Sequence, residues 1–131
     1  MEIIKRLRRL RKKPQIRVRL LMTTGCIEYW LMLHYKLFAP PLLTVPDKEK
    51  MLAQVIRMEP TYKKGNYNAT ARIAQYYPTA VKNAEIVFKR LLEEGMPGLE
   101  DTDERNRWLC TNCKTFSTVQ EAIIFLDGLQ A

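Results

Sequence analysis

The residues of this sequence that could bind a metal ion are three cysteines and one histidine. Cys110 and Cys113 have the Cys-x2-Cys spacing, and Cys26 with His34 could complete a zinc set of the Cys3His type. One such pair is only half of a site, and Cys26 and His34 would have to converge on it from a predicted helix. Reduced cysteines with no ligand role are therefore the expected state. We predict no metal and no cofactor.

The titratable residues of the sequence do not indicate a catalytic site. His34 has no serine or cysteine nucleophile at a recognisable spacing, and it is interpreted as a histidine on the surface of a helix. Glu100, Asp101, Asp103 and Glu104 cluster beside the N-terminus of a predicted helix, where acidic side chains interact favourably with the helix dipole. A Gly-rich phosphate loop is absent from the sequence. We predict that the protein is not an enzyme.

The binding of polyanions is better supported, because the charge of the chain is segregated. Residues 1–19 hold nine basic side chains and one acid, whereas residues 20–131 hold thirteen of each, so the formal charge of +8 is all N-terminal. Such segregation points to nucleic-acid phosphates or to the anionic inner leaflet of a membrane. The candidate binding residues are Lys5, Arg6, Arg8, Arg9, Arg11, Lys12, Lys13, Arg17 and Arg19, extended by a smaller cluster at Lys63 and Lys64.

Two elements are expected to position the N-terminal charges. Residues 2–12 predict a short amphipathic helix that Pro14 stops, with its basic side chains opposite an apolar stripe. The stripe consists of Ile3, Ile4, Leu7 and Leu10. The following residues alternate in polarity, which predicts a half-buried β element with Arg17 and Arg19 outward. Its apolar positions are Ile16, Val18 and Leu20. Residues 1–22 are therefore predicted to form one basic platform.

The remainder, residues 23–131, is predicted to be a helical body. Helices are expected over 26–38, 67–76, 79–94 and 118–129, from a Thr44–Asp47 capping box to about Met58, and after a cap at Asp101 or Thr102. The inner face of the helix after Thr44 is assigned to Met51, Leu52, Val55 and Ile56. The helix after Thr102 holds Trp108 and Leu109 and can extend to Phe116. Gly95 fits the C′ position of the 79–94 helix.

These elements predict one all-α domain over residues 1–131. The expected architecture is a compact five-to-seven-helix bundle with a short basic β element after the first helix. The sequence contains no run of about 18 apolar residues, so no transmembrane helix is expected. An odd number of cysteines without an export signal favours a reducing compartment.

Several segments resemble lentiviral matrix domains. Thr23-Thr24-Gly25-Cys26, followed by Trp30-Leu31 in an apolar helix, is similar to the entry into their second helix. A basic first helix, a basic β segment, a Thr/Gly turn and a helix with an early Trp occur in the order of that family. Residues 107–110 resemble the family's aromatic-rich fourth helix, and residues 118–123 the start of its last helix. Trp30 lies later than the usual spacing of the family, and residues 66–102 have no clear counterpart in it.

The resemblance implies a retroviral matrix domain of the non-myristoylated kind, because Glu2 stands where the family usually has the acylated glycine. Such a structural protein targets a Gag-like polyprotein to the inner face of the plasma membrane through acidic phospholipids, with phosphoinositides expected among them. The implied partners are these lipids, RNA as a competing polyanion, further copies in a trimer or lattice, and the viral envelope glycoprotein tail. The implied locations are the virion, the host cytoplasm and the inner face of the plasma membrane.

The alternative is a small basic RNA- or DNA-binding helical protein that uses the same residues. Phosphate contacts would give it salt-dependent binding without sequence preference. Residues 1–19 contain no Phe, Tyr or Trp, so bases would have no aromatic side chain there on which to stack.

Overall fold

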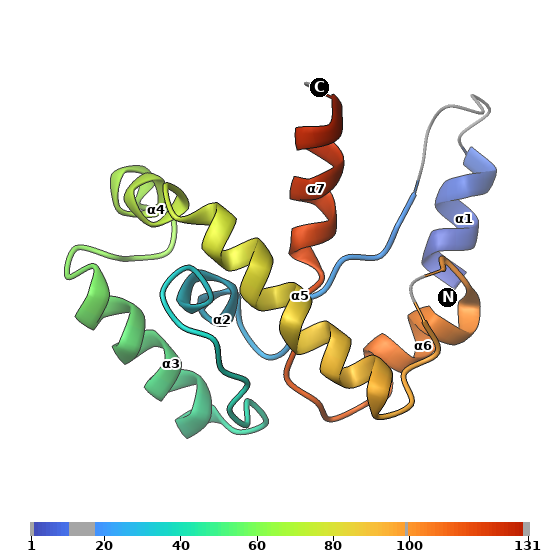
Figure 1. Ribbon diagram of the computed structural model, residues 1–131, viewed down its shortest axis with the longest axis horizontal. Coiled ribbons are helices and arrows are strands. Elements are labelled where there is room, and N and C mark those ends of the chain that lie inside the picture. The colour runs from blue at the N-terminus through green and yellow to red at the C-terminus, as the bar shows by residue number, and fades with distance from the viewer. Residues whose placement is uncertain (1, 11–17, 99, 130–131) are drawn as a thin grey trace.

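The computed structural model describes residues 2–10, 18–98 and 100–129. Within these ranges the chain is helical and has no strand longer than a single bridge, which confirms the all-α prediction. In chain order (Figure 1) the helices are α1 (Glu2–Leu10), α2 (Ile27–Met32), α3 (Val45–Met58), α4 (Tyr67–Ala74), α5 (Tyr77–Glu93), α6 (Asp103–Thr111) and α7 (Val119–Leu129). None of the described helices is both long enough and apolar enough to cross a membrane.

The predicted β element is not formed in the described part of its range, residues 18–22. Thr23 instead makes one antiparallel bridge with Ser117, flanked by a backbone hydrogen bond from Thr118 N to Met22 O at 2.7 Å. The pairing stops there because the partner segment turns into α7 directly after Thr118. The side chains of this segment still alternate between inward and outward positions, although no ladder of β hydrogen bonds forms. Leu20 and Met22 pack against the core. Ile16 and Arg17 lie outside the described residues.

The second helix is shorter than predicted: α2 ends at Met32, whereas the sequence predicted a helix to Phe38. Residues 33–35 continue as a turn, and Lys36 N donates to Met32 O at 3.0 Å. Beyond it, the carbonyl oxygen of Phe38 accepts a hydrogen bond from the Tyr29 hydroxyl at 2.8 Å. Helix α2 is nevertheless central, as predicted. Its buried residues are Glu28, Tyr29, Trp30, Leu31 and Met32.

Local capping signals predicted several helix ends correctly. Thr44 and Asp47 form the reciprocal capping box of α3, and the Thr102 side chain caps α6. Gly95 follows α5 with φ +106°, and Met96 N donates to Leu91 O at 3.0 Å, as in a Schellman motif.

Two burial predictions were only partly correct. Met51 and Val55 of α3 are buried, whereas Leu52 and Ile56 remain 37% and 39% exposed. Helix α6 ends at Thr111, so the buried Phe116 lies in the segment between α6 and α7.

Helix α5 joins two clusters of buried side chains. Ala80 and Ala84 of α5 belong to the cluster around α2, α3 and α4. Val87 and Phe88, further along the helix, pack with Leu109 of α6 in the second cluster. Helix α7 starts beside α5 and rises away from the other helices, and α1 lies at the side next to α6 (Figure 1).

Candidate polyanion-binding surface

Helix α1 carries the described N-terminal basic residues on its surface. Lys5, Arg6 and Arg9 are exposed. Lys5 Nζ lies 2.7 Å from the carboxylate of Asp103 at the start of α6, and this contact lowers the pKa of Asp103. Arg9 pairs with Glu2 of the same helix at 2.8 Å. Within the described residues, Arg6 makes no ion pair. The side chain of Arg8, and Arg11, Lys12, Lys13 and Arg17, lie outside the described residues.

The apolar side of α1 differs from the prediction. Ile3 and Leu7 were expected to form a buried stripe, but they are 68% and 40% exposed. The side chains of Ile4 and Leu10, the other two members of the predicted stripe, lie outside the described residues. Exposed Ile3 and Leu7 therefore stand beside exposed Lys5, Arg6 and Arg9.

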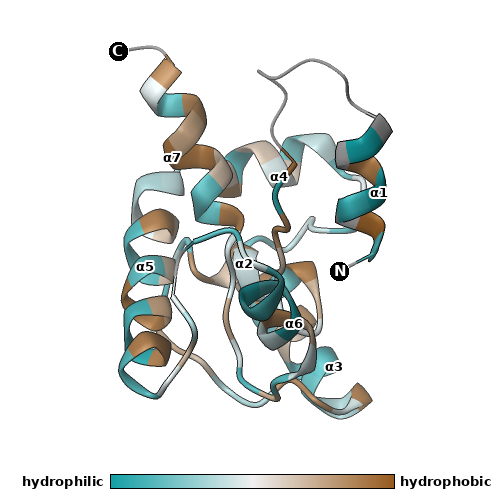
Figure 2. Cartoon of the chain, turned by 90° about the vertical axis from the view of Figure 1, so that its right-hand side faces the viewer, coloured by the Kyte–Doolittle hydropathy of each residue, from teal (hydrophilic) through white to brown (hydrophobic). Residues whose placement is uncertain are grey.

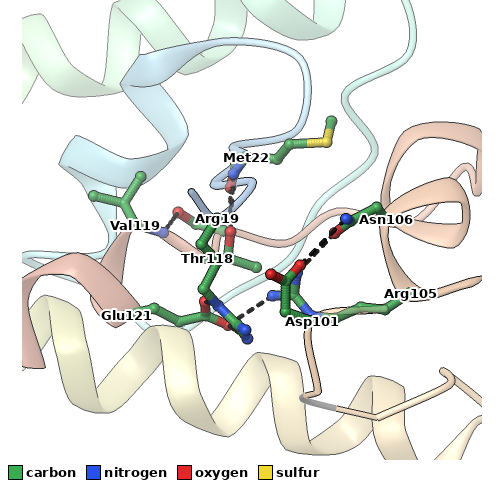
Figure 3. A network of polar contacts seen from close by, with 9 residues as sticks. Arg19, Met22, Asp101, Arg105, Asn106, Thr118, Val119 and Glu121 are labelled. Carbon is green, nitrogen blue, oxygen red and sulfur yellow. Dashed lines mark hydrogen bonds and ion pairs between the residues drawn. The ribbon is translucent and has the colours of Figure 1, made fainter. Parts of the chain in front are cut away.

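Arg19 is exposed, in agreement with its predicted outward position, but its side chain is paired with an acid of the helical body. Its guanidinium makes two hydrogen bonds to the carboxylate of Glu121 in α7 (Figure 3). These bonds raise the pKa of Arg19. Arg105 Nη2 of α6 lies 2.8 Å from Oε1 of the same carboxylate. The carboxylate of Glu121 thus binds two arginines, Arg19 and Arg105, that come from different parts of the chain.

Sequence reasoning missed Arg105, whose side chain is fully buried. Burial lowers the pKa of Arg105, against the attraction of Glu121, which raises it. The Arg105 side chain also donates to Asn106, while its Nε is buried without a hydrogen-bond partner. The sequence around Arg105 does not predict that its side chain is buried, because the carboxylate that pairs with it is sixteen positions away in another helix.

Lys63 and Lys64 do not extend the N-terminal platform. They lie in the turn between α3 and α4, at the opposite end of the molecule from α1 (Figure 1). Lys64 Nζ lies 3.7 Å from the buried carboxylate of Glu28, which also accepts a hydrogen bond from the Tyr62 hydroxyl. Burial and the nearby Glu28 raise the pKa of Tyr62 to about 12. Lys64 therefore partly compensates a buried acid.

The candidate zinc ligands are not brought together. Among the described residues, which include Cys26, His34, Cys110 and Cys113, no three His, Cys, Asp or Glu side chains gather in a group that could hold a metal ion. Cys110 and Cys113 are exposed around the end of α6, and Cys26 is half-buried beside α2. The interpretation of His34 as a surface residue was wrong, because its side chain is only 4% exposed. Its Nδ1 lies 3.0 Å from the carbonyl oxygen of Trp30.

A groove between α5 and α7 was also missed by sequence reasoning. It encloses about 970 Å³, and its apolar walls include Val81, Phe88 and Leu92 of α5 with Ile124 and Phe125 of α7. The signal in the sequence was the composition of α7, which is apolar on nearly every side.

Comparison of the chain with protein-family models, with curated proteins and with solved structures finds no match. The resemblance to matrix domains therefore rests on the sequence features alone.

Proposed function

We propose that this chain is a matrix-like domain that docks on acidic phospholipids of the inner leaflet of the plasma membrane through α1. The observation that supports the proposal is the joint exposure of basic and apolar side chains on that helix. Lys5, Arg6 and Arg9 offer charge to lipid headgroups, while Ile3 and Leu7 are exposed beside them. An amphipathic helix with these two faces can lie in the plane of a membrane interface.

The apolar side of α1 favours a membrane over nucleic acid. A phosphate backbone would use the basic side chains but would leave Ile3 and Leu7 exposed to water. A bilayer interface can take up both kinds of side chain, since apolar residues of interfacial helices enter the boundary between headgroups and acyl chains. RNA remains a competing polyanion for the same basic residues.

A single copy that binds through these basic residues holds a membrane only weakly. Each Lys or Arg close to an anionic surface contributes roughly 1 kcal/mol. If about half of the eight basic residues before Arg19 contribute, the total of about 4 kcal/mol corresponds to millimolar binding. Several linked copies bind far more tightly than one, because each further contact is intramolecular. The proposal therefore includes self-association in a trimer or lattice beneath a viral envelope, where the envelope glycoprotein tail is a further partner.

Liposome flotation of nuclease-treated protein tests the proposal. Wild-type protein should float with vesicles that contain an acidic phosphoinositide and stay behind with neutral vesicles. Arg6→Glu with Arg9→Glu should abolish flotation. Lys48→Glu with Lys50→Glu on α3 makes the same charge change on exposed lysines far from α1, and it should leave most of the flotation intact. Flotation that ignores lipid charge would overturn the membrane proposal.

A second pair of variants separates membrane from RNA binding. Ile3→Ser with Leu7→Ser removes the exposed apolar side chains of α1 and keeps every charge. Flotation should weaken by about tenfold or more, while binding of a single-stranded RNA should stay unchanged. Tight RNA binding with no detectable flotation of the wild type would favour the alternative of a small nucleic-acid-binding protein.

A further inference from the structure

The outer surface of α7 is more apolar than the surface of an isolated domain should be. Ile124, Phe125, Leu126 and Leu129 are between 48% and 67% exposed. They lie on the part of α7 that rises away from the other helices (Figure 1), and the helix is largely coloured as hydrophobic (Figure 2). A helix that is apolar all round is normally covered on all sides. Contiguous exposed patches of this kind mark interaction sites.

The groove between α5 and α7 is an apolar surface that could cover the exposed side chains of an α7 helix from another copy. Its lining is mainly apolar side chains of α5 and α7. The charged and polar residues that also line it are Arg19, Lys82, Glu85, Lys89, Gln120 and Glu121. Both lysines are exposed, and neither makes an ion pair within the described residues. Helix α7 contains two acids, Glu121 and Asp127, and no basic residue. Glu121 is already held by two arginines, so Asp127 is the carboxylate that remains for a partner.

We propose that a second copy of this chain occupies the groove, with its α7 lying between α5 and α7 of the first copy. The arrangement is self-complementary, because α7 is at once a wall of its own groove and the apolar ridge that would fill the groove of the other copy. A two-fold axis lets both copies make the same contact, as in most homodimers. Lys82 or Lys89 of each copy then meets Asp127 of the other.

The exposed side chains of α7 supply part of the apolar surface that such a pair needs. The four side chains present roughly 400 Å² per copy, within the size range of functional patches. A specific interface buries about 800 Å² on each partner, and apolar residues of α5 such as Val81 and Leu92 add to this surface. The pairing itself rests on α5 and α7, whereas its use in multiplying weak membrane contacts rests on the proposed function.

Sedimentation equilibrium between about 10 and 500 μM tests the pairing. Wild-type protein should show a concentration-dependent dimer. Phe125→Glu should weaken it by at least about 30-fold, the effect of removing a central apolar residue from an interface. Ile56→Glu is the matched control, because Ile56 is an exposed apolar residue on α3 and should leave the dimer unchanged. Both variants should keep the wild-type unfolding transition, since both side chains are substantially exposed.

A charge exchange tests the orientation of the two copies. Lys82→Glu with Lys89→Glu should weaken the dimer by about two- to fivefold, and adding Asp127→Lys should restore it. A wild type that stays monomeric at all concentrations, or a dimer that Phe125→Glu leaves intact, would overturn the inference. Flotation of the wild type on acidic vesicles keeps the two proposals apart. A wild type that is monomeric and still floats contradicts the pairing, and a wild-type dimer that fails to float contradicts the membrane proposal.

Discussion

Glu121 is the residue on which two arginines of the structure depend. Arg105 is fully buried and Arg19 is partly exposed, and both bind the Glu121 carboxylate. Glu121→Gln should therefore lower the free energy of unfolding by about 3–5 kcal/mol, because it leaves a buried cation without its acid. Arg19→Gln should cost only about 1 kcal/mol, since the Arg105–Glu121 pair survives. Urea unfolding followed by circular dichroism measures both, and equal losses would contradict the assignment.

His34 gives the fold a pH dependence near neutrality. Burial lowers its pKa below 6.5, although hydrogen bonds to the Trp30 and Leu31 carbonyls oppose this shift. The unfolded chain therefore binds the proton more readily than the folded chain. The stability from neutral His34 is complete above pH 6.5 and is lost as the pH falls toward the folded-state pKa.

Urea unfolding at about pH 7.5 and 5.5 measures this effect. The wild type should lose stability on acidification, by at most about 1.4 kcal/mol per pH unit for this single group. His34→Gln should show a clearly smaller loss over the same interval, whatever its stability at pH 7.5. An equal loss in both proteins would assign the pH dependence to other groups.

At the scale of the elements, Gly95 and Gly128 give a matched test of left-handed and helical backbone. Gly95 has φ +106° after α5, whereas Gly128 lies in the last turn of α7 and has no positive φ. A Cβ at either position meets no atom within 4 Å, so only the backbone distinguishes them. Gly95→Ala should destabilise by about 1 kcal/mol, and Gly128→Ala should stabilise by about 0.5–1 kcal/mol. Thermal unfolding of both variants measures the difference, and shifts of the same sign would contradict it.

The same contrast explains which elements the sequence could predict. Helix caps such as Thr44 with Asp47 depend on neighbours three residues apart, so they are visible in the sequence. The early end of α2 and the pairing of Arg19 depend on contacts made elsewhere in the fold. Arg19 and Glu121 are 102 residues apart, and no pattern around either residue identifies the other. For the same reason the basic residues were identifiable as a group, but their individual ion pairs were not.

At the scale of the whole molecule, two surfaces of different chemistry lie on different elements. The membrane contact proposed for α1 is mainly electrostatic, whereas the pairing proposed for α7 is mainly apolar. Raising NaCl from about 0.05 to 0.5 M shortens the Debye length to roughly 4 Å, which screens exposed charges. Apolar association does not weaken under the same change.

Flotation and sedimentation of one wild-type sample at both salt concentrations therefore separate the two surfaces. Flotation on acidic vesicles should fall steeply at 0.5 M NaCl, because the charges of α1 no longer attract the bilayer. The dimer constant should change by less than about threefold, since the screened lysine–aspartate contacts contribute little beside the buried apolar residues. If the dimer dissociates together with the loss of flotation, self-association is electrostatic, and α7 is not its interface.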